Sequence, residues 1–360
     1  MTATADLSNI ADVVQRAGVA GAGGAGFPSY AKWTRIDEVD HLMVNHQESE
    51  PNYYIDKWLG KEYPDLFADL FDRLLDELLQ TVIIGAKEKN REEWMGPLEE
   101  AAPGTVYLPD DLPIDADEES GVVYTYTVDT YQLGMESVLL NMAVDTIIGR
   151  DLPMDHGFIV QNTETLYNIR NAIEDGTPVT DKWVHVGGDV PTHRFLEVPV
   201  GTPASDVLEA GGLEGGELPE GAIMADGGPG WCFECDLGPE TFGVTKRTNA
   251  LLVLDRATAE EYTFGDGRIN LLEERGWGSE DDEREPSERL EPEEVHIPLI
   301  TNPDFEGIVA PSEPVVEVGD AVTVGDVVAE PAEGISNFQH ASIDGTVTDI
   351  TDRHVVVARD

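Results

Sequence analysis

The first 180 residues alternate between apolar segments with a helical period and short runs of β-branched residues. Apolar residues recur every three or four positions in 64–80 and in 7–17, where Ser8 precedes them, and this spacing predicts amphipathic helices. Further strands and helices are expected between and after these two segments: strands at 41–45, 81–85, 122–128 and 157–161, and helices at 134–148 and 163–174. Such alternation predicts an α/β domain over residues 1–180.

Short strands and turns replace this pattern from residue 181, with one helix expected at 204–210. They predict a second domain over 181–256, a small sheet with that helix packed on it. Residues 257–295 are predicted to be an acidic linker, because 276–294 is rich in charged residues and proline. Valines separated by Gly-Asp turns predict a compact all-β module over 296–360. This module contains no lysine, which excludes a biotinyl or lipoyl carrier function.

The chain is strongly acidic, with 72 Asp and Glu against 22 Lys and Arg and a formal net charge of -50. Its hydrophobic content of 41% is too high for a disordered acidic chain. A folded protein with this charge is favoured in concentrated salt, where repulsion between surface carboxylates is largely screened. We therefore predict a cytoplasmic protein of an extreme halophile.

The charge also disfavours nucleic acid as a partner, because binding phosphates requires clustered Lys and Arg. No stretch reaches the roughly 18 apolar residues of a membrane-spanning helix, and residues 1–10 lack the pattern of a secretory signal. We expect no direct insertion into a membrane, so that any peripheral location there depends on partner subunits.

Cys232 and Cys235 are the only cysteines of the sequence and form one Cys-x-x-Cys pair. Such a pair supplies half of a metal site. Three interpretations remain open: a redox dithiol, a half-site completed by another subunit, and two reduced buried thiols, of which we favour the last. No metal site is expected from this chain alone, and the spacing of His41 and His46 does not indicate one.

Residues 21–26 read Gly-Ala-Gly-Gly-Ala-Gly and satisfy the pattern G-x-G-x-x-G. In a dinucleotide-binding Rossmann unit that pattern follows a strand and opens a helix. Here a helix precedes it and Phe27-Pro28 follows it, so a Rossmann loop is not predicted. A backbone without side chains can still present N–H groups to a phosphate and admit a flat ring. The alternative is a glycine-rich turn without a ligand.

Four motifs together resemble a known family. Residues 21–33, from the glycines to Lys32-Trp33, resemble the flavin-binding loop of the NADH-oxidising FMN subunit family, which includes NuoF of complex I, RnfC and the cobalamin reductase PduS. The family's other three motifs are similar, in the same order, to Asn45-His-Gln-Glu-Ser-Glu-Pro51, Tyr131-Gln-Leu-Gly-Met-Glu-Ser137 and Gln161-Asn-Thr-Glu-Thr165. The resemblance implies a flavoprotein oxidoreductase of electron transport, of the NADH dehydrogenase type.

The resemblance extends into the rest of the chain. Residues 198–206, 227–229 and 246–250 resemble the SLBB segment of the family, a β-grasp-like unit, and 308–349 resemble its barrel-sandwich module, in the order found in PduS. The implied fold is an FMN-binding α/β domain, an SLBB β-grasp-like domain and a C-terminal all-β barrel-sandwich hybrid module.

Candidate site residues follow from the matched motif positions. The resemblance implies FMN contacts for Gly21, Gly23, Gly24, Lys32, Asn45, Gln47, Glu48 and Ser49, with Asn162 and Thr165 at the phosphate end. Phe27, Glu50 and Glu136 fall where the family contacts NADH, and Tyr131 and Gly134 belong to the third motif. Aromatic rings stack on flat ligands, and carboxylates accept hydrogen bonds from ribose or amide groups.

The implied function is an FMN-dependent oxidoreductase subunit that accepts hydride from NADH. Its family normally carries cysteine-rich runs for [4Fe–4S] clusters after the SLBB segment, and residues 246–360 contain no cysteine. We therefore expect no iron–sulfur cluster from this chain alone and an electron-accepting partner protein or other subunits of a redox complex. Two alternatives are a non-catalytic assembly or docking subunit of a respiratory or Rnf-like complex, and a PduS-like corrinoid reductase.

Overall fold

The computed structural model describes residues 7–274, 276–277, 282–302 and 307–360. The chain divides into two compact units. Unit 1 comprises residues 1–14, 29–49 and 54–176, and unit 2 comprises 15–28, 50–53 and 177–360. The predicted first domain is therefore not one continuous body, because its segments 15–28 and 50–53 belong to unit 2.

Unit 1 is built on a parallel sheet with the strand order β3-β4-β2-β1-β5. Its strands are β1 (His41–Asn45), β2 (Thr81–Lys87), β3 (Thr105–Tyr107), β4 (Gly121–Thr127) and β5 (Phe158–Asn162). All seven residues of β2 are buried. Such a strand needs apolar side chains on both faces, which is the reason for its continuous β-branched run. The α/β class predicted for this part of the chain is confirmed.

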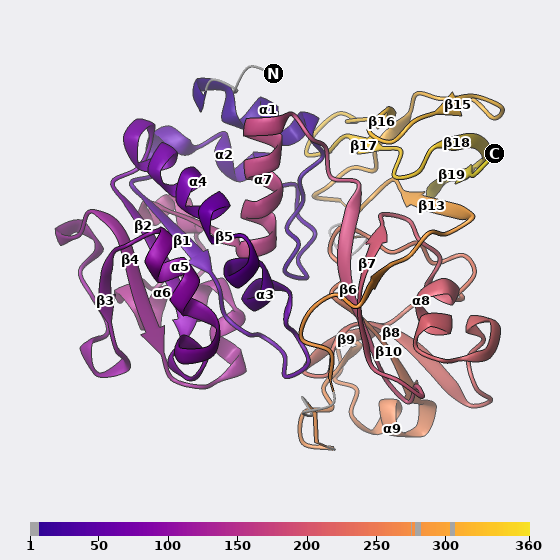
Figure 1. The fold of residues 1–360 in the computed structure, drawn as a ribbon, viewed down its shortest axis with the longest axis horizontal. Coiled ribbons are helices and arrows are strands. Elements are labelled where there is room, and N and C mark those ends of the chain that lie inside the picture. The colour runs from indigo at the N-terminus through magenta and orange to yellow at the C-terminus, as the bar shows by residue number, and fades with distance from the viewer. Residues whose placement is uncertain (1–6, 275, 278–281, 303–306) are drawn as a thin grey trace. The chain divides into compact units, whose positions relative to one another are not determined.

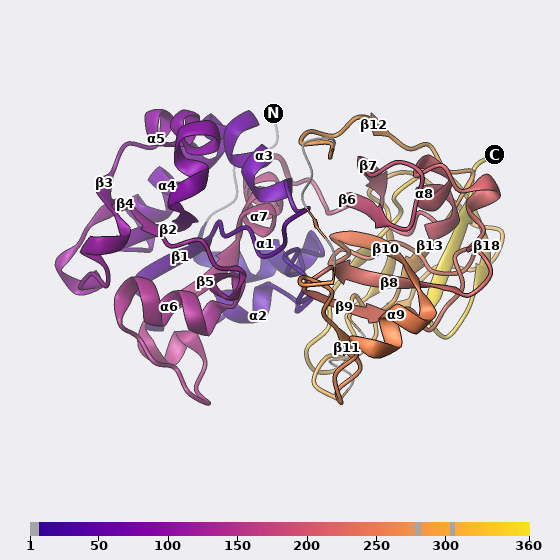
Figure 2. The ribbon, with the colours of Figure 1, turned by 90° about the horizontal axis from the view of Figure 1, so that it is seen from below.

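Helices cover both faces of this sheet, with α3, α4 and α5 on one side and α6 on the other (Figure 2). The helices of this part of the chain are α1 (Ile10–Arg16), α2 (Tyr30–Trp33), α3 (Ile55–Glu62), α4 (Pro64–Glu77), α5 (Gly96–Ala101), α6 (Glu136–Val144) and α7 (Thr163–Asp175). Among the described residues, no helix is long and apolar enough to span a bilayer.

The sequence dictates these helices locally. Pro64 begins α4, where its missing N–H costs nothing, and the apolar residues of α4 recur with a helical period and are buried. The amide of Thr165 donates to the Asn162 side chain at the start of α7, and Gly176 ends that helix in the left-handed conformation. On the opposite face of the sheet, Leu139 and Leu140 of α6 pack in one core cluster with strand residues such as Ile83.

Unit 2 contains a mixed sheet with the strand order β11-β9-β8-β10-β6-β7-β12 (Figure 1). Its strands are β6 (Asp181–Gly188), β7 (Arg194–Pro199), β8 (Ala222–Gly228), β9 (Trp231–Glu234), β10 (Ala250–Asp255), β11 (Arg268–Ile269) and β12 (Glu288–Arg289). Helix α8 (Ala204–Ala210) packs through Val207 and Leu208 against strand residues such as Leu196 and Leu251. The predicted sheet with one packed helix is thus present, together with a second helix, α9 (Arg256–Glu261).

The C-terminal part of unit 2 holds two antiparallel sheets with the orders β13-β19-β18-β15 and β14-β16-β17. Their strands are β13 (Glu294–Pro298), β14 (Glu313–Pro314), β15 (Ala321–Val322), β16 (Val327–Glu330), β17 (Gln339–His340), β18 (Gly345–Ile350) and β19 (His354–Ala358). Val295, Val347, Val355 and Val357 are fully buried in one core cluster. The all-β module predicted from the valine pattern is confirmed.

The segment predicted to be a linker, 257–295, is in large part folded, so this prediction was wrong for most of its described residues. It contributes most of α9, together with β11, β12 and the start of β13. Ile269 and Leu271 are buried, and the Trp277 indole N–H donates to the Leu271 carbonyl at 2.9 Å. A few widely spaced apolar residues therefore anchor a segment whose overall composition is polar. Residues 275 and 278–281 of this segment lie outside the described residues.

Within unit 2, the buried Lys246 joins the segment 15–28 to the C-terminal module. Its ammonium donates to the Gly18 carbonyl at 2.8 Å and to the Phe338 carbonyl at 3.2 Å. Gly18 has a φ of +68°, and a Cβ there would lie 2.5 Å from the Phe338 carbonyl oxygen, so only glycine fits. Asn302 adds a hydrogen bond from its amide to the Ala25 carbonyl at 2.7 Å.

We predict that Lys246 makes the stability of unit 2 depend on pH. Burial lowers the pKa of this ammonium from 10.5 to about 7. Between these values the unfolded chain binds the proton and the folded chain does not, so stability rises with pH. Relative to Lys246→Met, the free energy of unfolding of the parent protein should increase by up to about 5 kcal/mol between pH 7 and 10.5. Urea unfolding at constant KCl would measure it, and a difference that does not vary with pH would contradict it.

Candidate functional site

Most of the predicted site residues lie at the carboxyl-terminal edge of the parallel sheet in unit 1. Asn45 ends β1, and in the register of the sheet it lies opposite Gly85 of β2 and Asn162 of β5. Lys87 ends β2 opposite Thr127, the last residue of β4. Because the strands are parallel, the segments that follow all four strands leave the sheet at the same edge.

This edge contains the point where the chain reverses direction across the sheet. From β1 the chain moves to β2 and then to β3 and β4 on one side, and it returns to β5 on the other side of β1. In open α/β sheets, ligands bind outside the carboxyl ends of the strands at such a switch point. Asn45 and Asn162 stand on either side of it.

Lys32 and Glu136, from the first and third motifs, meet in unit 1. The Lys32 ammonium donates to the Glu136 carboxylate at 3.2 Å and to the Val160 carbonyl of β5 at 3.0 Å. Both side chains are partly exposed. The cation is therefore held at the edge of the sheet and still accessible to a ligand.

The second and third motifs pack directly on one another. The Asn45 amide donates to the Gly134 carbonyl at 2.8 Å, and the Asn45 side-chain oxygen accepts from the Gln47 amide N–H. A Cβ at Gly134 would lie 2.5 Å from the Cβ of Ser49, so this close approach requires glycine. Gln47 donates from its side chain to Thr127 at 3.0 Å. The two loops consequently form one rigid surface.

Glu48 lies in a group of three lysines that the sequence analysis did not identify. We call Lys57, Lys87 and Lys89 the lysine cluster. Their ammonium groups lie 3.2, 3.8 and 3.0 Å from the Glu48 carboxylate, and Lys87 and Lys89 also lie 3.4 and 3.0 Å from Asp129. Burial alone would raise the pKa of Glu48, but the three ammonium groups offset it and hold that pKa below its usual value.

The lysines carry the opposite cost of burial. Burial lowers the pKa of Lys57 to about 8, against the attraction of Glu48. Burial also lowers the pKa of Lys87, whose side chain is fully buried and lies 4.0 Å from the centre of the Tyr131 ring. One signal in the sequence could have found the cluster: four of the seven lysines, 57, 61, 87 and 89, lie within 33 residues.

At the start of α7, a carboxylate occupies the place where a phosphate was expected. Asn162 donates to one Asp56 oxygen at 2.7 Å, and the Glu164 amide donates to the other at 3.3 Å. Asn162 also accepts from the Thr165 amide as the helix cap. Both predicted residues are thus present together, and Asp56, which the sequence analysis did not single out, provides the anion at this helix end.

His46 lies behind this edge as a neutral side chain. Its Nδ1 lies 2.8 Å from the Thr163 hydroxyl, and burial together with the nearby Lys57 lowers its pKa to about 4. Among the described residues, no group of three or more His, Cys, Asp and Glu is arranged to hold a metal ion.

Five predicted residues belong to unit 2: Gly21, Gly23, Gly24, Phe27 and Glu50. The glycine-rich segment forms a closed turn in which the Gly21 amide donates to the Phe27 carbonyl and the Gly26 amide to the Gly21 carbonyl. A Cβ at Gly26 would lie 2.9 Å from Arg247 and from Asn302, so the turn packs tightly on this unit.

Glu50 is used inside unit 2. Its buried carboxylate accepts from the Gly230 amide at 2.7 Å, and a Cβ at Gly228 would lie 2.2 Å from its Cγ. Burial, followed by the charges of Glu50 and Asp226, raises the pKa of Cys232 far above the usual range. Burial raises the pKa of Cys235 in the same direction. Both thiols therefore remain protonated at neutral pH, which supports the interpretation as reduced thiols over a reactive dithiol.

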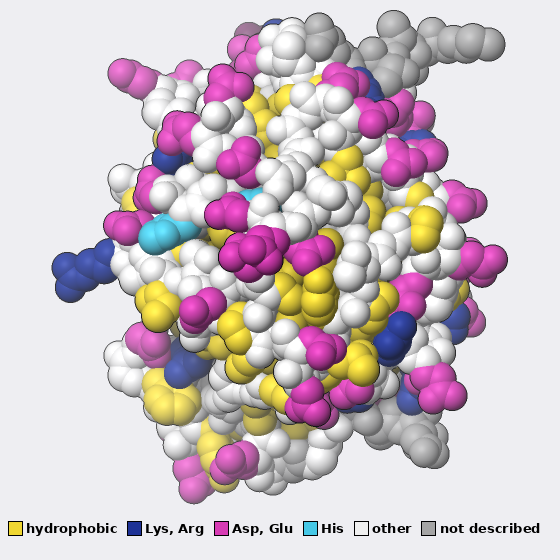
Figure 3. Space-filling view, turned by 90° about the vertical axis from the view of Figure 1, so that its left-hand side faces the viewer, with side chains coloured by type: hydrophobic (Ala, Val, Ile, Leu, Met, Phe, Trp, Pro, Cys, Tyr) yellow, Lys and Arg dark blue, Asp and Glu magenta, His cyan; other side chains and the backbone are white. Residues whose placement is uncertain are grey.

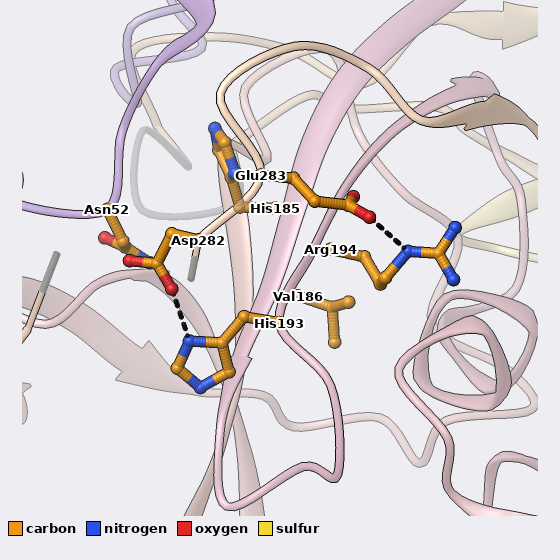
Figure 4. Close-up of a pocket in the computed structure, with 7 residues that line it drawn as sticks. All are labelled: Asn52, His185, Val186, His193, Arg194, Asp282 and Glu283. Atoms are coloured by element: carbon orange, nitrogen blue, oxygen red, sulfur yellow. Dashed lines mark hydrogen bonds and ion pairs between the residues drawn. The ribbon is translucent and has the colours of Figure 1, made fainter. Parts of the chain in front are cut away.

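Unit 2 also contains a small pocket that the sequence analysis did not identify (Figure 4). It is lined by Asn52, His185, Val186, His193, Arg194, Asp282 and Glu283. The His193 ring lies 2.9 Å from Asp282, and Arg194 lies 2.9 Å from Glu283. Each acid is thus paired with a base, an arrangement that stabilises the end of β6 and the start of β7.

Comparison with known proteins gives two family matches. Residues 14–171 match the Nuo51 FMN-binding domain, and residues 281–360 match the RnfC barrel sandwich hybrid domain. The first match contains the edge of the parallel sheet described above. The second contains the two antiparallel sheets.

Individual relatives are more distant. Cobalamin reductase PduS of Citrobacter freundii is 30% identical over 261 residues, which cover 71% of this chain and 51% of that protein. One subunit of the ion-translocating oxidoreductase complex of Vibrio cholerae serotype O1 is 26% identical over 265 residues, 72% of this chain and 31% of that protein. The chain thus spans about half the length of PduS and about a third of the Vibrio cholerae protein.

A solved structure shares the fold. The crystal structure of an NAD⁺-reducing [NiFe]-hydrogenase in the H₂-reduced state superposes with a TM-score of 0.52 at 22% identity, covering 71% of this chain and 48% of that chain. By its two domains and its relatives, the chain combines a Nuo51 FMN-binding domain with an RnfC barrel-sandwich domain and is a distant homologue of PduS and RnfC.

Proposed function

We propose that this protein is an FMN-dependent electron-transfer subunit that accepts hydride from NADH and passes electrons to a partner protein. The observation that carries the proposal is the meeting of three motifs of unit 1 at the switch point of a parallel sheet. Lys32 contacts Glu136, and Asn45 contacts Gly134. The match of residues 14–171 to an FMN-binding domain supports the same conclusion.

The side chains at this edge fit a flavin chemically. A flavin ring presents carbonyl oxygens and ring nitrogens that accept hydrogen bonds, and Lys32, Asn45 and Gln47 provide donors at this edge. The close contact of Gly134 with Ser49 leaves no side chain between the two loops, which suits a flat ligand. When bound, FMN supplies the chemistry of accepting a hydride and releasing single electrons. Gly21, Gly23, Gly24, Phe27 and Glu50 stay predictions as nucleotide contacts.

The protein's own residues have a limited task in such a reaction. Hydride transfer between two cofactors needs orientation and exclusion of water rather than a general base. Lys32 is held by Val160 and Glu136, so its ammonium is already oriented before a ligand arrives. His46 is neutral and engaged with Thr163, which makes it a structural side chain rather than an acid or base.

The electrons need an acceptor outside these 360 residues. A [4Fe–4S] cluster takes four cysteine thiolates, and this sequence has two cysteines. Their raised pKa values disfavour thiolates as well. We therefore propose a cluster-bearing partner in a redox complex. Location in the cytosol of an extreme halophile stays a prediction that rests on the net charge of -50.

Two other functions compete with this one. A non-catalytic docking subunit would retain the fold without flavin. A corrinoid reductase would use the flavin to reduce cob(II)alamin, and the 30% identity to cobalamin reductase PduS favours testing it.

We predict that the protein, purified in concentrated KCl, binds FMN and that anaerobic NADH bleaches its visible absorption. Bleaching reports hydride transfer directly, because a flavin that accepts a hydride loses its visible absorption band. Chromatography of the released chromophore identifies FMN. A colourless protein that binds no added FMN would contradict the proposal and favour the docking subunit. A flavin that bleaches with another donor but not with NADH would contradict the choice of donor.

The purified chain should also contain no stoichiometric iron or acid-labile sulfide. The reason is the shortage of thiolate ligands. Metal analysis by mass spectrometry, with a colorimetric sulfide assay, would check this. Finding both elements in stoichiometric amounts would contradict the proposed electron route and assign Cys232 and Cys235 to a cluster.

Replacing Lys32 should weaken FMN binding. Lys32→Met removes a charge-assisted hydrogen bond, of the kind that contributes about 1.5–3 kcal/mol, so the Kd for FMN should rise about 10- to 100-fold. Arg35→Gln is the matched control, because Arg35 lies near Lys32 in the chain and forms ion pairs with the exposed Glu38 and Asp155. Quenching of FMN fluorescence would measure both. Equal affinities in the two variants would show that Lys32 does not contact the flavin.

A further inference from the structure

The lysine cluster concentrates positive charge in a protein that carries very little of it. The chain has a net charge of -50, and acidic side chains are spread over the face drawn in Figure 3. Three of its seven lysines nevertheless surround the single carboxylate of Glu48. An anionic ligand that approaches this molecule therefore meets a repulsive field, except where such cations are grouped.

The charges within the cluster do not balance. Three ammonium groups face two carboxylates, Glu48 and Asp129. Glu48 is buried and fixed, whereas the Asp129 side chain is 53% exposed. If Asp129 turned into solvent, three cations would face one buried carboxylate. Asp129 is therefore the exchangeable anion of the cluster.

Lys87 has an unused donor. Its side chain is fully buried, and its ammonium makes no hydrogen bond in the part of the chain that the structure describes. Its contacts to Asp129 at 3.4 Å and Glu48 at 3.8 Å are longer than a good N–H···O bond. Burying an ammonium without satisfied donors is costly. An anion with several oxygens at the place of Asp129 would satisfy Lys87 and Lys89 together.

The cluster also lies where ligands bind in such folds. Lys87 ends β2, and Asp129 and Tyr131 follow the adjacent β4, at the same edge as the motif residues. The other natural place for an anion, the start of α7, already holds the carboxylate of Asp56. The lysine cluster is thus the cationic place at this edge with an exposed anion that can be displaced.

We propose that the lysine cluster binds a phosphate group of a nucleotide, which takes the place of the Asp129 carboxylate. Lys89 and Lys87 donate to the phosphate oxygens, and Lys57 holds Glu48 beneath them. That the nucleotide is FMN or NADH rests on the function proposed above. The phosphate site itself rests only on the cluster.

Three variants test this proposal. Lys89→Gln removes the partly exposed donor, and Asp129→Asn removes the competing charge while keeping the side-chain shape. Lys61→Gln is the matched control, because Lys61 lies over the Trp94 ring at 4.8 Å, outside the ion pairs of the cluster. Calorimetric titration with inorganic pyrophosphate at fixed ionic strength measures the site without a cofactor. Thermal unfolding verifies that each variant is folded.

Lys89→Gln should weaken pyrophosphate binding about tenfold, since a charge-assisted hydrogen bond is lost. Asp129→Asn should strengthen it several-fold, and Lys61→Gln should leave it unchanged. A cluster that serves only to stabilise the fold would not bind more tightly after Asp129→Asn. Equal binding to all four proteins, or binding weakened by Asp129→Asn, would overturn the proposal.

The source of the phosphate follows from titrating FMN and NADH separately, each by fluorescence. If Lys89→Gln weakens FMN alone, the phosphate is that of the flavin. If it weakens NADH alone, the phosphate belongs to the donor. Pyrophosphate responses with the expected signs in a protein that binds no FMN would support the anion site and reject the proposed function. FMN bleached by NADH, with both affinities unaffected by Lys89→Gln, would reject the anion site alone.

Discussion

Strand β1 pairs on both sides, with β2 and with β5, and the arrangement of the site depends on this pairing. The register sets Asn45 beside Gly85 and Asn162, and it brings the segments after β1, β4 and β5 to one edge. A slip of one residue would turn every side chain of β1 to the opposite face of the sheet. The buried residues on both faces, such as Leu42 and Met43, prevent that slip, so the hydrophobic core also defines the geometry of the edge.

Charge acts at two different ranges in this molecule. The carboxylates at the surface repel one another and any anionic ligand, and dissolved salt screens that repulsion because these groups are exposed. The lysine cluster is mostly buried, so its attraction for an anion is screened much less. A very acidic protein in concentrated salt can thus combine a solvated acidic surface with a local cationic site. Glu48 makes this possible by offsetting the cost of burying Lys57 and Lys87.

Prediction from the sequence succeeded where the pattern was local and repetitive. The helix at 64–77 and the strands around 41–45 and 81–87 follow from apolar periodicity. It failed for 257–295, where a few buried side chains such as Ile269 and Leu271 outweigh a polar composition. It also assigned Glu50 to a ligand, whereas in the fold that carboxylate binds the Gly230 amide. No property of residues 45–51 alone distinguishes these two uses.

The sequence by itself determined the α/β class of the first part, the all-β nature of the last part, the acidic surface and the order of the four motifs. These properties depend on composition and on periodicity over neighbouring residues. Only the tertiary structure decided that Glu48 is surrounded by Lys57, Lys87 and Lys89 and that Asp56 occupies the start of α7. The physical reason is that parallel strands are joined by long crossover connections. Residues that are distant in the chain therefore meet at one edge, at distances set by strand register and side-chain packing rather than by their spacing in the sequence.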